Sequence, residues 1–191
     1  MNAAHTIDIL AVIEPETSLE RKILSNDAFV SGLQWGSPRF GHPEGKIILH
    51  VGEVLRNIDK LPISKEQRRI LRIVAIVHDT FKCSEDRNTP RDWSKHHSVL
   101  AFNFIQKYTD EKAILQTTLH HDEPFYAWLH IHKNQEELSN KKLEFIKSNV
   151  DDLNLLYYFF LCDTMTGDKL LKPLVWFENQ MGIESLSEYL I

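Results

Sequence analysis

Cysteine is scarce in this chain of 191 residues, which contains two, Cys83 and Cys162. Two such residues cannot build a disulfide framework, and they lack the C-x-x-C spacing of zinc ligands. We therefore expect free thiols in a reducing compartment. Long apolar runs are lacking too, because the longest candidate, residues 153–162, is closed by Asp163 and falls short of the roughly 18–20 residues that a membrane span needs. The N-terminus has no basic start followed by an apolar stretch, so the sequence predicts a cytoplasmic protein without a membrane partner.

An excess of positive charge is also missing, since 22 Lys and Arg stand against 27 Asp and Glu, for a net charge of −5. Proteins that grip nucleic-acid backbone are usually strongly basic, so we expect no extended nucleic-acid surface. Glycine and proline, at seven each, leave few breaks, and no segment alternates with period two. The sequence predicts an all-α fold with a single domain over residues 1–191. Its core is expected at about 41–181, and residues 1–40 are the least regular segment.

Helical periodicity is clearest in residues 45–61, where Ile47, Val51, Val54 and Ile58 fall on one face. A second helix is predicted to begin at Ser64, with Gln67 as its capping-box partner, and to run through the apolar segment that ends at His78. A polar, charged loop follows as an expected rim. Further helices are predicted over Ser94–Tyr108, Asp110–His121, Pro124–Lys133, Glu136–Asn149, Asp151–Thr164 and Lys169–Met181.

Histidine is the abundant residue, with ten in the chain, and it is the commonest metal ligand in proteins. Six lie on or at the ends of helices with strong apolar faces, and Asp79 and Asp163 each follow a long apolar run. Such groups must be paired or bound to a metal, because burying them alone costs several kcal/mol. Imidazole and carboxylate together are typical ligands of divalent ions. Each residue alone also has an ordinary interpretation as a satisfied core histidine or a helix cap. We give only that interpretation to His5, His130 and His132, while His42 is a possible pocket residue.

The order of these residues resembles the HD-domain metal-dependent phosphohydrolases. That family shows a helix-borne His, then His-Asp at the end of a buried helix, then a distant Asp. Here these positions are His50, His78-Asp79 and Asp163. The stretch GHPEGKIILHVGEVL is similar to the family's entry to its first ligand helix, and VHDTFK resembles its HD-x-x-K. The match runs over about residues 41–169.

Two further stretches resemble the family members that hold two or three metals. HHSVLAFNFI favours His97 over His96 as a ligand, and LHHDEPF offers both His120 and His121, with His121 the better anchored. The resemblance implies two divalent ions with Asp79 as their bridge, and it does not distinguish among Mn, Fe, Mg, Zn and Ni. The implied metal ligands are His50, His78, Asp79, His97, His120, His121 and Asp163.

Departures from known subtypes narrow the expected activity. The His pair lacks the Gly-Tyr-Pro that follows it in cyclic-dinucleotide phosphodiesterases. The alarmone hydrolases carry the motif HD-x-x-E-D, whereas Lys82 occupies one of the motif positions here, so that activity is also disfavoured. The expected substrate is therefore a small phosphorylated compound. A nucleotide-like substrate is favoured by Phe125, Tyr126 and Trp128, which are typical of base stacking and of core packing alike.

The implied mechanism is attack on phosphorus by a hydroxide that the metal ions activate. Asp79 would orient it, and Asp163 would assist its deprotonation. Lys82 would bind a phosphoryl oxygen and neutralise charge in the transition state, with Lys169 and Arg56 as weaker phosphate-binding candidates. Residues 32–45 are a candidate lid. Two alternatives remain open: a non-catalytic module that keeps the metal for sensing or binding, and an HD-fold di-iron oxygenase. Whether the chain forms a homo-oligomer is also left open.

Overall fold

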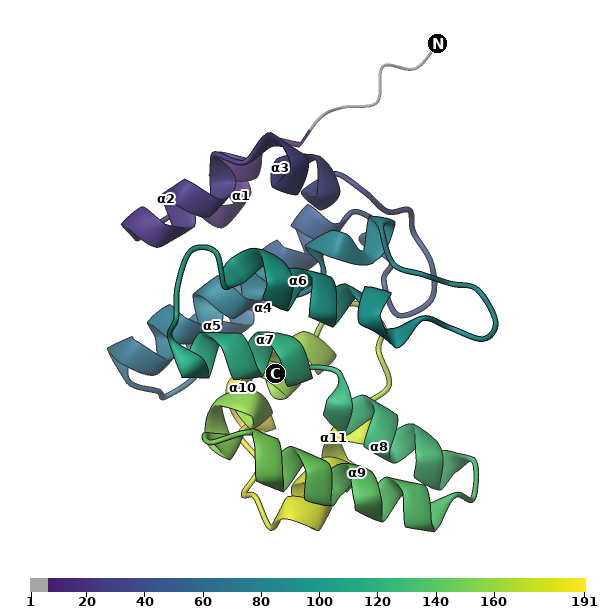
Figure 1. Ribbon diagram of the computed structural model, residues 1–191. Coiled ribbons are helices and arrows are strands. Elements are labelled where there is room, and N and C mark those ends of the chain that lie inside the picture. Colours follow the sequence, from purple (N-terminus) through teal and green to yellow (C-terminus); the bar gives the residue numbers. More distant parts are fainter. Residues whose placement is uncertain (1–6) are drawn as a thin grey trace.

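The computed structural model describes residues 7–191 and has an all-α fold, which confirms the predicted class (Figure 1). The N-terminal helices are α1 (Ile9–Ile13), α2 (Ser18–Leu24) and α3 (Asp27–Leu33). The central helices are α4 (Ile47–Lys60), α5 (Lys65–Val77), α6 (His97–Ile105) and α7 (Lys112–His120). The C-terminal helices are α8 (Glu123–His132), α9 (Glu136–Asn149), α10 (Leu153–Thr164) and α11 (Lys172–Met181). Short 3₁₀ helices are η1 (Thr80–Cys83), η2 (Trp93–Lys95) and η3 (Ser187–Tyr189).

The N-terminal segment is more regular than its sequence predicts. Helices α1, α2 and α3 each begin at a side chain that accepts backbone N–H bonds, namely Asp8, Thr17 and Asn26. Their apolar side chains join the common hydrophobic core: Ile13, Ile23, Phe29 and Leu33 are at most 1% exposed. The core therefore begins well before residue 41, and it also takes in Leu190.

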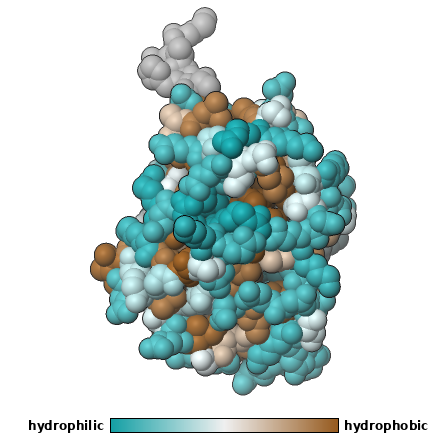
Figure 2. All heavy atoms as spheres, turned by 90° about the vertical axis from the view of Figure 1, so that its left-hand side faces the viewer, coloured by the Kyte–Doolittle hydropathy of each residue, from teal (hydrophilic) through white to brown (hydrophobic). Residues whose placement is uncertain are grey.

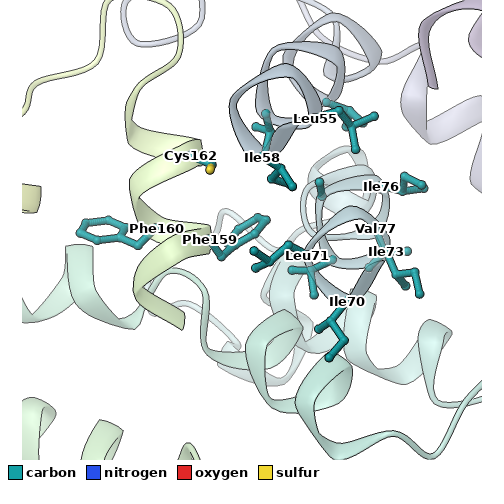
Figure 3. Packing of buried hydrophobic residues seen from close by; sticks show 14 of the residues in the cluster. Leu55, Ile58, Ile70, Leu71, Ile73, Ile76, Val77, Phe159, Phe160 and Cys162 are labelled. Carbon is teal, nitrogen blue, oxygen red and sulfur yellow. The ribbon is translucent and has the colours of Figure 1, made fainter. Parts of the chain in front are cut away.

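Helices α4, α5 and α10 make the centre of the core (Figure 3). The predicted capping box at the start of α5 is confirmed, because the Ser64 hydroxyl accepts from Gln67 N and the Gln67 side chain accepts from Ser64 N. Phe159 of α10 and Leu71 of α5 point toward one another in Figure 3, and both are fully buried. This packing fixes the relative positions of three helices that carry candidate site residues.

Polar side chains gather where several of these helices end or begin. His78 and Asp79 follow the last residue of α5, His121 follows α7, and Asp163 lies in the last turn of α10. His97 opens α6, which starts three residues later than Ser94 because η2 occupies the intervening turn. The fold thus brings helix termini from distant parts of the chain to one region.

Two loops that are distant in sequence, residues 34–46 and 165–171, lie against each other at that region. The Gly41 N–H donates to Asp168 Oδ1 at 2.6 Å. Gly167 has a φ of 54°, and a Cβ at this position would lie 2.7 Å from Cδ of Pro43. Only glycine allows this backbone conformation and this close approach without strain.

The exterior is mixed in character. Figure 2 shows hydrophilic side chains over most of one face, with hydrophobic ones in scattered groups between them. Within residues 7–191, no helix combines the length and apolar character that a membrane span requires. Cys83 is exposed and Cys162 is buried, and both are free thiols.

Candidate metal centre

Six of the seven predicted metal ligands lie together in the interior. His50 comes from the first turn of α4, and the others come from the helix termini described above. Burial is nearly complete for the histidines and for Asp79, while the Asp163 side chain is 18% exposed. The six residues are His50, His78, Asp79, His97, His121 and Asp163. Buried imidazoles and carboxylates must be paired with one another or with a bound cation.

The first group consists of His50, His78 and Asp163, whose ligand atoms lie within 4.8 Å of one another. Nε2 of His50 is 2.8 Å from Asp163 Oδ1, and Nε2 of His78 is 3.7 Å from the same oxygen. Two imidazole nitrogens and one carboxylate oxygen therefore face a common point, an arrangement that can hold a divalent cation.

The second group consists of Asp79, His97 and His121. Nε2 of His97 lies 3.3 Å from Nε2 of His121, and Asp79 Oδ1 lies 3.4 Å from the first and 3.9 Å from the second. Oδ2 of Asp122 adds a further oxygen 3.0 Å from His97 Nε2. Two ring nitrogens that face each other at this distance share one proton or one cation.

Asp79 connects the two groups through its two carboxylate oxygens. Oδ2 lies 3.5 Å from His78 Nε2 in the first group, whereas Oδ1 faces the second group. Oδ2 also accepts a hydrogen bond from the Lys82 ammonium. One carboxylate therefore stands between two sets of ligands, which is the position of a bridging ligand.

The outward-facing ring nitrogens of the histidines are already engaged. His78 and His121 each donate Nδ1–H to the backbone carbonyl three residues earlier, at 2.9 and 2.8 Å. Nδ1 of His97 lies 3.1 Å from Glu85 Oε1, and Nδ1 of His50 lies 3.5 Å from a Glu44 oxygen. Such partners fix the ring orientation, so that the neutral imidazole offers its Nε2 lone pair to a metal.

Two inward-facing atoms lack an ordinary partner. Among the described residues, neither Nε2 of His78 nor Oδ1 of Asp79 has a hydrogen-bond partner, although both are buried. A buried polar atom without a partner is costly, and a cation in each group would satisfy the atom that faces it. The residues present therefore fit a metal site.

The electrostatics of the cluster also favour positive charge at its centre. Burial opposes protonation, yet Asp79 and Asp163 raise the pKa of His78 to about 9. Burial is likewise outweighed at His97, where Asp122 and Glu85 raise the pKa to about 9. Burial lowers the pKa of His50 to about 3 and of His121 to about 4. The carboxylates thus favour the protonated form of His78 and His97, whereas His50 and His121 are neutral.

Two of the predicted site residues lie elsewhere. The ring of His120 packs against Phe145 at a centroid distance of 5.5 Å, and His120 belongs to neither ligand group. Arg56 lines a separate pocket on the α1–α4 side, together with Glu14 and Asp59. The structure therefore does not place His120 or Arg56 at the metal cluster, because α7 and α4 turn these side chains away from it.

The other histidines have separate partners. Both ring nitrogens of His96 are engaged at 2.9 Å, by the hydroxyls of Ser98 and Tyr126. His130 bonds to the Gln135 side chain, and His132 stacks on Trp128. His5 lies outside the described residues.

Sequence reasoning did not identify three carboxylates around the cluster. Glu85 forms a group with His96 and His97, and Glu44 forms one with His42 and His50. Asp122 is the third, and its position directly after the His pair was an available signal. Glu44 and Glu85 lie in loops, so no periodic pattern marks them.

A pocket of about 440 Å³ opens beside the cluster, a size typical of small-molecule sites. Lys82, His97, Asp122 and Asp163 contribute to its polar lining. Nζ of Lys169 donates to the Asp163 carbonyl and to Oδ1, each at 2.9 Å. The apolar part includes the predicted aromatic residues Phe125, Tyr126 and Trp128, and the candidate lid contributes Phe40, Gly41 and His42.

Comparisons of the chain with protein-family models, with curated proteins and with solved structures find no match. An all-α fold does not specify an activity by itself. Function must therefore be argued from the cluster and from the pocket that opens onto it.

Proposed function

We propose that this protein is a metal-dependent phosphohydrolase that cleaves a phosphate ester, in a nucleotide or a related small molecule. The observation that carries the proposal is the position of Asp79, whose two oxygens face separate ligand groups at 3.5 and 3.4 Å. Paired metal sites that share a carboxylate are typical of enzymes that displace an oxygen at phosphorus.

The first metal ion would be held by His50, His78 and Asp163, and the second by His97 and His121, with Asp79 common to both. Divalent ions bound there would act as Lewis acids toward phosphoryl oxygens and lower the pKa of a bound water. Glu44 and Glu85, whose carboxylates lie beside Nδ1 of His50 and of His97, would keep these rings in the ligating orientation.

Lys82 and Lys169 give the pocket a cationic lining next to the cluster. Both line it, and both ammonium groups donate to a carboxylate of the cluster. Although burial opposes its charge, Asp79 and Asp122 raise the pKa of Lys82, so it stays protonated. A phosphate over Asp79 would meet these cations, which would orient it and offset charge that develops in the transition state.

Aromatic side chains support a substrate with an apolar part. Phe125 and Trp128 line the pocket with ring centroids 5.9 Å apart, and Tyr126 lies between them in sequence. Flat rings of this kind stack on a nucleobase. Together with the pocket volume, they favour a nucleotide-sized phosphate ester over a large substrate.

The proposal is tested by screening nucleotides and simple phosphate esters with the protein loaded separately with Mn²⁺, Fe²⁺, Mg²⁺, Zn²⁺ or Ni²⁺. We expect hydrolysis that Asp79→Asn and His97→Gln reduce by at least about 10²-fold. The control is His130→Gln, which alters a half-buried histidine outside the cluster and should leave activity unchanged. Bound metal without hydrolysis of any ester would indicate a sensing or binding module instead. Dioxygen-dependent turnover by the iron form would indicate an oxygenase.

A further inference from the structure

Arg91 is a pocket residue that the sequence does not single out. It lies in the polar loop between η1 and α6, which extends away from the helices at the right of Figure 1. Its side chain is 30% exposed and lines the same pocket as the cluster. A cation in this place can select among ligands that reach the metal centre.

The loop that carries Arg91 is held by its own acidic side chains. The Asp86 carboxylate accepts bonds from the backbone N–H groups of Asn88 and Asp92, at 3.1 and 2.8 Å. The adjacent Glu85 side chain is 8% exposed and reaches His97, at 3.1 Å from Nδ1. The loop is thereby connected to a candidate metal ligand and its shape is fixed from within.

The guanidinium of Arg91 is positioned by contacts that leave donors free for a ligand. It lies over the Trp93 ring, 5.3 Å from the centroid, and beside the Tyr126 hydroxyl. Its Nη1 is 3.5 Å from Glu85 Oε1, an oxygen that His97 approaches more closely. A guanidinium has five N–H donors in a planar fork that matches phosphate and carboxylate.

Arg91 and Lys169 flank the cluster on different sides. Lys169 contacts Asp163 in the first ligand group, whereas Arg91 lies beside Glu85 and Tyr126, next to the second group. Lys82, on Asp79, lies between the two groups. A phosphate centred on Asp79 would therefore leave Arg91 available for another part of the same molecule.

We propose that Arg91 binds a second anionic group, so that the preferred substrate is a phosphate ester that carries another phosphate or a carboxylate. This inference rests on the proposed function for the reacting phosphate. Arg91 is thus a specificity-determining residue, and its effect is confined to ligands with two anionic groups.

The first experiment measures binding by calorimetry to the Mn²⁺-loaded full chain, with inorganic pyrophosphate and inorganic phosphate as probes. We expect Arg91→Ala to weaken pyrophosphate binding by about tenfold or more and phosphate binding by less than about twofold. Arg91→Lys keeps the charge but not the fork, and we expect an intermediate loss. The control is Lys95→Ala, which removes a cation from the same loop at a side chain that is 62% exposed, and both affinities should stay unchanged.

Equal losses for both probes, no loss for either, or the same result for Arg91→Ala and Lys95→Ala would overturn the proposal. Kinetics with adenosine 5′-monophosphate and adenosine 3′,5′-bisphosphate separate it from the proposed activity. If no ester is hydrolysed but Arg91→Ala selectively loses pyrophosphate, the role of Arg91 stands and the hydrolase proposal fails. If esters are hydrolysed but Arg91→Ala hydrolyses both nucleotides with the same kinetics as the wild type, the hydrolase proposal stands and the role of Arg91 fails.

Discussion

The buried ion pair between Arg72 and Glu20 attaches the N-terminal helices to α5, the helix that leads into His78 and Asp79. Arg72 Nε donates to Glu20 Oε1 at 3.0 Å, and Nη2 donates to the Ile13 carbonyl at 3.0 Å. Glu20 is 0% exposed and Arg72 is 4% exposed. Removing one partner of such a pair leaves a buried charge, which costs about 3–5 kcal/mol.

We therefore expect Arg72→Met to lower the free energy of unfolding by about 3–5 kcal/mol. For a domain of this size that corresponds to a melting temperature about 6–20 °C lower. The double variant Arg72→Met/Glu20→Leu removes both charges and should be less destabilised than Arg72→Met alone. It should still lose about 1 kcal/mol, because the Glu20 carboxylate also accepts the Thr17 N–H at 2.9 Å.

Urea unfolding followed by circular dichroism measures these differences. The control is Arg69→Met on the same helix, because Arg69 is 30% exposed and pairs with two solvent-accessible carboxylates, Glu66 and Glu111, so a loss of at most about 1 kcal/mol is expected. If Arg72→Met cost no more than Arg69→Met, the pair would not anchor the N-terminal helices, and the reasoning from burial would be refuted.

Three further predictions concern the cluster and its supports. The pKa of His78 and of His97 is raised to about 9, so protons compete with a metal ion for these rings at neutral pH. The affinity of the protein for the metal should therefore rise from pH 6 to 9. Competition with a chelator measures it, and an affinity that does not change with pH would contradict the prediction. Asn57→Leu removes the two 3.0 Å hydrogen bonds that the Asn57 amide donates to the Cys162 and Met165 carbonyls at the end of α10. Urea unfolding should show a free energy of unfolding that is lower by about 1–3 kcal/mol. Gly167→Ala would push a Cβ against Pro43 and should weaken phosphate binding in calorimetry at unchanged helix content.

Much of the cluster could be predicted because helical periodicity marks polar residues on apolar faces. His50 interrupts the apolar stripe of α4, and His78-Asp79 ends the apolar run of α5. Their order with Asp163 along the chain resembles that of the HD-domain phosphohydrolases, and this resemblance is what predicted that they lie together. The structure does bring them together, while the identity and number of metal ions remain predictions.

The choice between His120 and His121 could not be made from sequence. Neighbouring residues on a helix point about 100° apart, and the rotation of α7 against its neighbours decides which ring faces inward. His121 is fixed by its bond to the Thr118 carbonyl, whereas His120 meets Phe145 on another side. Only tertiary packing contains that information.

The short N-terminal helices were missed for a different reason. Helices of five to seven residues are too short for periodicity over windows of about 11–18 residues. A local signal was present, since Thr17 and Glu20 have the spacing of a capping box and form one. The contacts that place Glu44 and Glu85, by contrast, depend on loop conformations that no local pattern specifies.

The contact between the loops at Gly41 and Asp168 joins positions 127 residues apart, and it affects the order in which the protein can mature. During synthesis, every other candidate ligand leaves the ribosome before Asp163 and Lys169. The nascent chain therefore cannot assemble the first ligand group or close the pocket wall until α10 and the following loop have emerged. A metal ion held by the first group would stabilise only a chain that already includes α10, so binding of that ion would come late in folding.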